Sequence, residues 1–212
     1  MKMRITTVLI WLTVAAAFGI SGIFYPKMPV IMASHWNAAG QVDGYMPKSV
    51  LMFLLPGIMA AEALFFYAIL LIDPLRKNIF KFRVYYEGFI LLITIFLLAV
   101  HLFTIAWSLR IQISMNVFMP LMIGILFFVM GSILPHLKPN WFLGIRTPWT
   151  LSNETVWNRT HRIGGILFKT AAIFVLFGAL RPQYAVGMVL TPVLAASLLT
   201  ILYSLVLYLR LK

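Results

Sequence analysis

The sequence predicts an all-α polytopic membrane protein in which a single membrane domain, residues 1–212, crosses the bilayer six times. Of the 212 residues, 62% are hydrophobic and 10% are charged, and the mean hydropathy is +0.98. That is more apolar surface than one globular core can bury. Six apolar runs approach the roughly 20 residues that cross about 30 Å of hydrocarbon as a helix. They are residues 5–24, 50–72, 85–109, 115–134, 163–180 and 185–209.

The apolar runs are expected to be helices, because backbone groups in lipid need partners within their own segment. A membrane barrel would show alternating strands of about 10 residues, and the sequence has no such pattern. The first run also resembles a signal peptide, since Lys2 and Arg4 precede it and Ala15-Ala16-Ala17 resembles a cleavage site. Because the apolar run continues to Phe24, we expect a retained helix.

The basic residues predict that both termini are cytoplasmic, because Lys and Arg near short loops resist translocation. Six spans place both termini on one side, and the opposite side has only Lys27, Lys48, Arg110 and Arg181, while Lys169 lies inside a span. Short basic loops beside helices have anionic lipid headgroups as their usual partner. The net charge of +12 therefore indicates the lipid bilayer and no direct nucleic-acid partner. The cytoplasmic group is Lys2, Arg4, Arg76, Lys77, Lys81, Arg83, Lys138, Arg146, Arg159, Arg162, Arg210 and Lys212.

The external loop that follows the first span, residues 25–49, is expected to be compact because prolines and glycines punctuate it. Its His35 and Asp43 are eight residues apart with no second histidine nearby, which falls well short of a zinc site or a hydrolase set. The alternative is a structural loop. In that interpretation Asn37 and Asp43 accept hydrogen bonds from local amides, while Trp36 and Tyr45 lie at the headgroup level.

Two polar residues inside the spans, Glu62 and His101, have both a structural and a functional interpretation. An ionisable group in hydrocarbon costs at least a few kcal/mol and by default suggests function. The rise of 1.5 Å per residue offsets the two side chains by about 6 Å, so a direct hydrogen bond between them is not favoured. Either Glu62 is protonated and satisfied within the protein, or it faces a wet cavity on a proton or substrate path.

The cytoplasmic loop, residues 138–162, contains three tryptophans among arginines, which is typical of a segment that lies along the membrane interface. Ser152 is the expected N-cap of a helix that starts near residue 153 and continues into the fifth span. Glu154 would lie favourably in its first turn.

The sequence contains no known catalytic motif and no sign of a cofactor. It has no cysteine, which excludes disulfides, thiolate metal ligands and thiol catalysis. A Gly-rich phosphate loop, G-x-S-x-G and H-E-x-x-H are also missing. We expect no enzyme, no cofactor and no metal site.

Two stretches resemble the SdpI family of bacterial membrane proteins. The external YPKMPVIMASHWNAAGQVDGYMPK resembles the domain of unknown function at the N-terminus of SdpI-type proteins, with its Pro-rich lead, His-Trp-Asn and Asp-Gly. The cytoplasmic NWFLGIRTPWTLSNETVWNRTHRIGG resembles the second half of the same family, in which Gly-x-Arg-Thr-Pro-Trp-Thr precedes a Trp and a His.

The resemblance implies an immunity protein in the bacterial plasma membrane that protects the cell from a secreted antimicrobial peptide toxin. It also implies signalling, in which the toxin-bound protein holds a cytoplasmic transcriptional repressor at the membrane. The implied toxin-contact residues are His35, Trp36, Asn37, Gly40, Asp43 and Gly44. The implied partner-binding residues are Gly144, Arg146, Thr147, Pro148, Trp149, Trp157, His161 and Arg162. The alternative function is a membrane transporter or enzyme that uses Glu62 and His101, or the His35/Asp43 loop.

Overall fold

The computed structural model describes residues 4–111 and 113–211. In these ranges six helices are long and apolar enough to cross a membrane, which confirms the predicted fold class. Lys2 and Lys212, which entered the charge count above, lie outside the described residues. The long helices are α1 (Ile5–Phe24), α2 (Lys48–Ile72), α4 (Arg83–Ser108), α5 (Met115–Ile133), α7 (Glu154–Gly178) and α8 (Ala185–Arg210).

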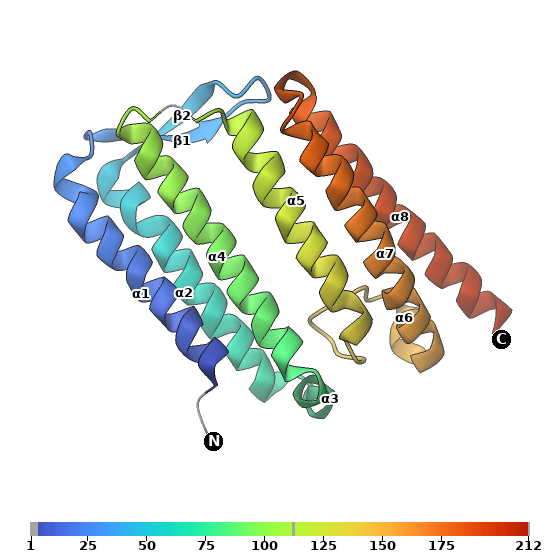
Figure 1. Ribbon diagram of the computed structural model, residues 1–212. Coiled ribbons are helices and arrows are strands. Elements are labelled where there is room, and N and C mark those ends of the chain that lie inside the picture. Colours follow the sequence, from blue (N-terminus) through green and yellow to red (C-terminus); the bar gives the residue numbers. More distant parts are fainter. Residues whose placement is uncertain (1–3, 112, 212) are drawn as a thin grey trace.

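The long helices form two groups of three, and packing is most extensive within each group. The N-terminal group is α1, α2 and α4, and the C-terminal group is α5, α7 and α8; the two meet along α4 and α5 (Figure 1). In the C-terminal group, a Cβ on Gly165 would lie 2.6 Å from the carbonyl oxygen of Gly131. Small residues thus let α5 and α7 approach closely, as is common between membrane helices.

Short elements connect the long helices at two distinct ends of the bundle. The hairpin end has strands β1 (Ile31–Trp36) and β2 (Val42–Pro47), and both described chain ends lie at the opposite, terminal end (Figure 1). The terminal end also has the short helices α3 (Arg76–Lys81) and α6 (Pro148–Ser152). Three 3₁₀ turns complete the described elements, at Tyr25–Lys27, Leu134–His136 and Pro182–Tyr184.

The loop at residues 25–49 is a β-hairpin, a structure that the sequence analysis did not predict. Its strands pair antiparallel, with Ile31 opposite Pro47 and His35 opposite Gly44. Asn37 closes the turn, since its Oδ1 accepts the backbone N–H groups of Ala39 and Gln41 at 3.0 Å each. Strand pairing supplies partners for backbone groups that would otherwise need water at the membrane surface.

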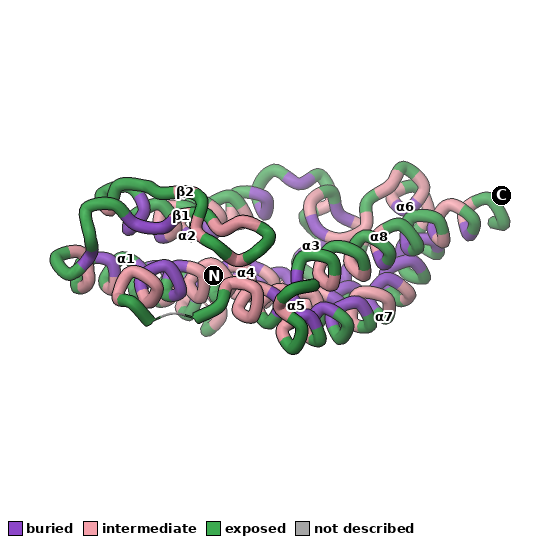
Figure 2. Tube along the Cα trace, turned by 90° about the horizontal axis from the view of Figure 1, so that it is seen from above, coloured by how far each residue is buried: buried purple, intermediate pink, exposed green. Residues whose placement is uncertain are grey.

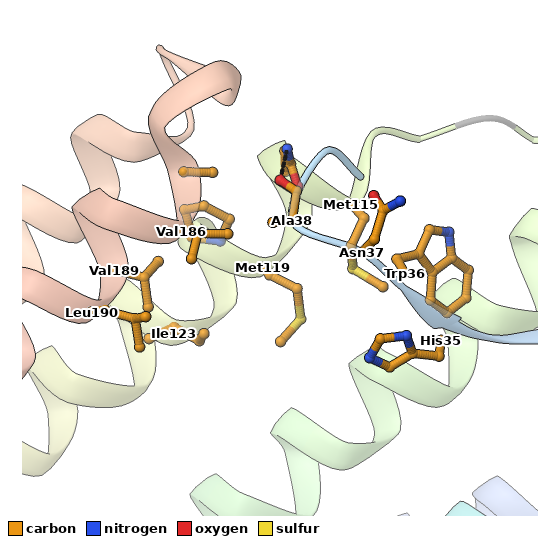
Figure 3. Close-up of a pocket in the computed structure, with 13 residues that line it drawn as sticks. His35, Trp36, Asn37, Ala38, Met115, Met119, Ile123, Val186, Val189 and Leu190 are labelled. Atoms are coloured by element: carbon orange, nitrogen blue, oxygen red, sulfur yellow. Dashed lines mark hydrogen bonds between the residues drawn. The ribbon is translucent and has the colours of Figure 1, made fainter. Parts of the chain in front are cut away.

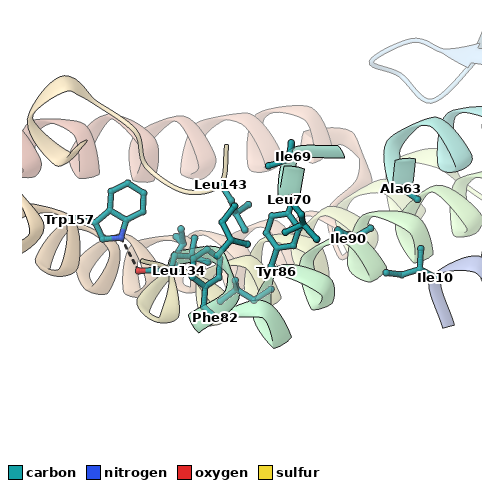
Figure 4. Packing of buried hydrophobic residues seen from close by; sticks show 13 residues of the cluster. Ile10, Ala63, Ile69, Leu70, Phe82, Tyr86, Ile90, Leu134, Leu143 and Trp157 are labelled. Carbon is teal, nitrogen blue, oxygen red and sulfur yellow. Dashed lines mark hydrogen bonds between the residues drawn. The ribbon is translucent and has the colours of Figure 1, made fainter. Parts of the chain in front are cut away.

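The main buried cluster lies toward the terminal end and joins the two groups. Ile10, Ile69 and Tyr86 come from the N-terminal group, and Trp157 comes from α7 (Figure 4). The indole N–H of Trp157 donates to the carbonyl of Leu137 at 2.8 Å. Many large apolar residues of the long helices are exposed, as expected of helices surrounded by lipid. Exposed residues recur along the helices of the trace (Figure 2).

The predicted N-cap of the fifth span is wrong by one residue. Asn153 caps α7, and its Oδ1 accepts the N–H groups of Thr155 at 2.9 Å and Val156 at 3.1 Å. Ser152 is instead the last residue of α6. The preceding turn begins with Thr147 as N-cap and a proline in its first helical positions, so it forms a separate helix that uses Ser152.

Candidate functional site

The hairpin brings His35 and Asp43 into direct contact. His35 Nδ1 lies 2.5 Å from Asp43 Oδ1, and the two side chains are 70% and 44% exposed. A Cβ on Gly44 would lie 2.8 Å from the Cβ of His35, so only glycine leaves room for the histidine at this point. The expectation that Asp43 bonds local amides is therefore corrected, because a bulge in the register turns it toward His35. Asn37 does bond local amides, as expected.

Trp36 anchors the hairpin to α4. Its ring packs edge-on against Phe103 and Trp107, with centroid distances of 5.3 Å and 5.7 Å. The ring thus lies against protein, whereas Tyr45 on β2 is 64% exposed. Aromatic contacts of this geometry contribute about 0.5–1.5 kcal/mol each beyond area burial, so they fix the hairpin over the ends of the helices.

A cavity of about 380 Å³ lies beneath the hairpin, between its tip, α5 and α8 (Figure 3). His35 and Asn37 line it from the hairpin, Met119 from α5 and Val189 from α8. A second cavity of about 320 Å³ lies toward α2 and α4, and His35, Trp36 and Met119 line both. The hairpin therefore covers a mostly apolar groove between the two helix groups.

Asn116 holds the hairpin tip at this groove. Its side-chain amide donates to the carbonyls of Ala38 and Pro182, both at 3.1 Å. Gly40 has a φ of 77°, and a Cβ there would lie 3.1 Å from Asn116. Sequence reasoning missed Asn116, because nothing in its local sequence indicates a contact with a turn 78 residues away.

The intramembrane residues Glu62 and His101 do not share a hydrogen bond, as expected from their offset. Glu62 Oε2 lies 3.2 Å from Thr94 Oγ1, and His101 Nε2 lies 2.9 Å from Ser21 Oγ. Both contacts are within the N-terminal group.

A second intramembrane acid, Glu87, was missed by the sequence analysis. Its side chain is fully buried, lies 2.7 Å from Arg83 Nε and 3.4 Å from Arg4 Nε, and so ties α1 to α4. The spacing of Arg83 and Glu87, four residues apart at the start of a span, was the signal that could have revealed it.

At the terminal end, His161 organises the loop that resembles the second SdpI motif. Its Nε2 accepts the backbone N–H of Ile145 at 3.0 Å, and its Nδ1–H donates to the carbonyl of Trp157 at 2.8 Å. Gly144 has a φ of 111°, and a Cβ there would lie 2.4 Å from His161 Nε2. Trp157 and His161 are both fully buried.

The other residues of this motif are more accessible. Arg146 and Pro148 are exposed, and the Arg146 guanidinium donates to the carbonyl of Trp141. Arg162 on α7 is exposed too. Trp149 is partly buried, and its indole N–H donates to Ser204 Oγ at 2.6 Å. The motif thus combines two buried, hydrogen-bonded side chains, Trp157 and His161, with two exposed arginines.

No cluster of three or more metal-ligating side chains occurs in the part of the chain that the structure describes. The His35/Asp43 pair offers one imidazole and one carboxylate. Two such ligands do not make a zinc site.

Comparisons with known proteins find matches for two segments of the chain and for one relative of similar length. Residues 136–208 match the SdpI/YfhL protein family, and residues 12–60 match a domain of unknown function, DUF1648. The chain is 27% identical over 205 residues to the immunity protein SdpI of Bacillus subtilis strain 168, covering 96% of this chain and 95% of that protein. No solved structure matches it. The chain is therefore a multi-pass bacterial membrane protein that is similar to SdpI along its length and matches the SdpI/YfhL family at residues 136–208.

Proposed function

We propose that this protein is an SdpI-type immunity protein that protects a bacterial cell against a secreted antimicrobial peptide, with the hairpin end outside the cell. A relative of nearly equal length is named an immunity protein. The family relationship points to a non-enzymatic function. The excess of basic residues at the terminal end supports a cytoplasmic location for that end.

The observation that carries the proposal is the groove covered by the hairpin. Its wall is mostly apolar, with His35 and Asn37 as polar groups at the hairpin (Figure 3). Apolar sites with a few well-placed polar groups are typical of ligand-binding cavities, and this one suits an apolar or amphipathic peptide. Asp43 orients His35, while Gly40 and Gly44 shape the hairpin.

Signalling would require toxin binding to shift the protein between two arrangements of its helices. Toxin that bound both arrangements equally would transmit nothing. A coupling free energy of about 1–3 kcal/mol corresponds to a preference of roughly 5–150-fold for one of them. Exposed Arg146, Pro148 and Arg162 would then contact a cytoplasmic repressor. Gly144 and the buried Trp157 and His161 would set the shape of that surface.

A protection assay tests the proposal. Cells of a sensitive strain that express the chain should survive at least one of a panel of secreted bacterial antimicrobial peptides, at a concentration that kills cells without it. His35→Ala with Asp43→Ala should abolish survival at equal membrane abundance. Survival of the double variant would reject the hairpin as the toxin contact, and a chain that protects against none of the peptides would reject the immunity function.

A cavity-filling variant tests the groove itself. Val189→Trp places an indole in the cavity beneath the hairpin, and it should reduce protection because the toxin loses its space. Leu194→Trp on the same helix is the matched control, since Leu194 is 63% exposed and does not line the cavity. Equal protection by both variants would exclude the groove.

A further inference from the structure

The partners of the five carboxyl groups set Glu62 apart. Asp43 contacts His35, and Glu87 lies between two arginines. Both oxygens of Asp73 accept backbone N–H groups, and Glu154 is exposed in the first turn of α7. Glu62 has a single contact, with Thr94, and its buried Oε1 has no hydrogen-bond partner in the described part of the chain. It lacks the cation or the set of N–H donors that an ionised carboxylate needs in an apolar interior.

The hydroxyl of Thr94 satisfies both of its contacts only when Glu62 is protonated. Thr94 Oγ1 lies 2.8 Å from the carbonyl oxygen of Ile90 and 3.2 Å from Glu62 Oε2. A hydroxyl has one proton to donate and two lone pairs that accept. An ionised carboxylate and the Ile90 carbonyl would have to share that one proton, because neither oxygen can donate. Both contacts are full hydrogen bonds only when the carboxyl of Glu62 carries a proton and donates it to Thr94 Oγ1.

The surroundings of Glu62 separate it from other polar groups. An apolar layer of Val14, Ala17 and Met59 packs on the side toward the hairpin, and Ile10, Ala63 and Ile90 are buried on the side toward the termini. Besides Glu62, the titratable and charged groups of the three packed helices are Arg4 on the α1 side, Lys48 and Tyr67 on α2, and Arg83, Tyr85, Tyr86, Glu87 and His101 on α4.

His101 lies on α4 seven residues after Thr94. Its hydrogen-bond partners place its ring proton on Nε2 and leave Nδ1 without a proton. Ser21 Oγ lies 2.5 Å from the carbonyl of Met52 and 3.0 Å from that of Ala17, so its proton is used there. The 2.9 Å contact with His101 is then donated by Nε2–H. Nδ1 remains a buried acceptor with no partner in the described residues. The seven residues from Thr94 to His101 correspond to about 10 Å along the helix, too far for direct proton transfer.

We propose that Glu62 is a proton-binding site inside the membrane, whose carboxyl keeps its proton at neutral pH and donates it to Thr94 Oγ1. Loss of the proton would leave an unpaired carboxylate between α2 and α4. Such a group is stable only if water or a cation reaches it, so release of the proton favours an arrangement of α2 and α4 that admits water. Proton binding and the packing of the N-terminal group are therefore linked, independently of any toxin.

Infrared spectroscopy of the full chain tests the proposal. The protein is reconstituted in vesicles of ether-linked lipids, which have no ester carbonyl to mask the carbonyl band of a protonated acid. At pH 7 the wild type should show this band, Glu62→Gln should lose it, and Glu154→Gln should keep it. The glutamine can still donate to Thr94, so the fold should survive. A wild type without the band, or an unchanged band in Glu62→Gln, would overturn the proposal.

Two further measurements keep the test decisive if Glu62→Gln does not fold. Labelling the glutamate carboxyls of the wild type with ¹³C should shift the band, and an unshifted band would assign the proton to an aspartate and overturn the proposal. Thr94→Val removes the acceptor while keeping the shape of the side chain. The band should then move to the higher frequency of a carboxyl without a hydrogen bond. An unmoved band would contradict the assignment of Glu62 as the donor.

Discussion

Asp73 and Trp141 join the two helix groups: the Asp73 carboxylate, which is 2% exposed, accepts the backbone N–H of Trp141 at 3.1 Å through Oδ2. Its Oδ1 accepts the N–H of Leu75 at 2.6 Å. Asn78 adds a hydrogen bond to the carbonyl of Pro139 at 2.9 Å. The end of α2 thus holds the loop that carries the SdpI motif, although the two lie about 70 residues apart in sequence.

Asp73→Ala should loosen this loop. A buried N–H left without its acceptor costs about 1–3 kcal/mol, so the free energy of unfolding should fall by that amount. Amide hydrogen exchange at residues 139–143 should rise. Asp73→Asn is the matched control, since its one oxygen keeps one of the two contacts and should give an intermediate effect. Unchanged exchange in Asp73→Ala would mean that Asp73 does not hold the loop.

Gly144→Ala should destabilise the terminal end. The residue has a φ of 111°, and the added Cβ would lie 2.4 Å from His161 Nε2. Backbone strain of this kind costs about 1–3 kcal/mol, and displacement of His161 adds to it. Thermal unfolding in detergent measures the loss. Gly187→Ala on α8, where a Cβ would meet nothing within 4 Å, should leave the unfolding temperature unchanged or slightly raised. An equal effect of the two changes would contradict the packing described here.

Asp43→Ala should affect protection far more than stability. The His35/Asp43 pair is largely exposed, and exposed ion pairs contribute about 0–1 kcal/mol. The unfolding temperature should therefore stay near that of the wild type, while survival under toxin falls because His35 loses its orientation. A variant that loses stability but keeps protection would make the pair a structural contact only.

The six spans were predictable because hydropathy is a local signal that each helix carries in its own sequence. The hairpin was not, since its strands are six residues long and pair across a turn without a hydrophobic alternation. The contact between His35 and Asp43 depends on an irregular register. The groove is lined by residues of the hairpin, α5 and α8. Its shape depends on how these three segments pack together, which the sequence of any one of them does not reveal. The pair of Arg83 and Glu87 had one local signal, its four-residue spacing at the start of the third span.

The central claim is that the hairpin lies outside the cell and the SdpI motif inside it. Because the chain has no cysteine, single cysteines at two exposed positions test it directly: Ala39→Cys at the hairpin tip and Ser152→Cys at the end of α6. A membrane-impermeant maleimide should label Ala39→Cys in intact cells and Ser152→Cys only after the membrane is opened. Labelling of both from outside, or of Ser152→Cys alone, would contradict the two-sided arrangement on which the proposed function rests.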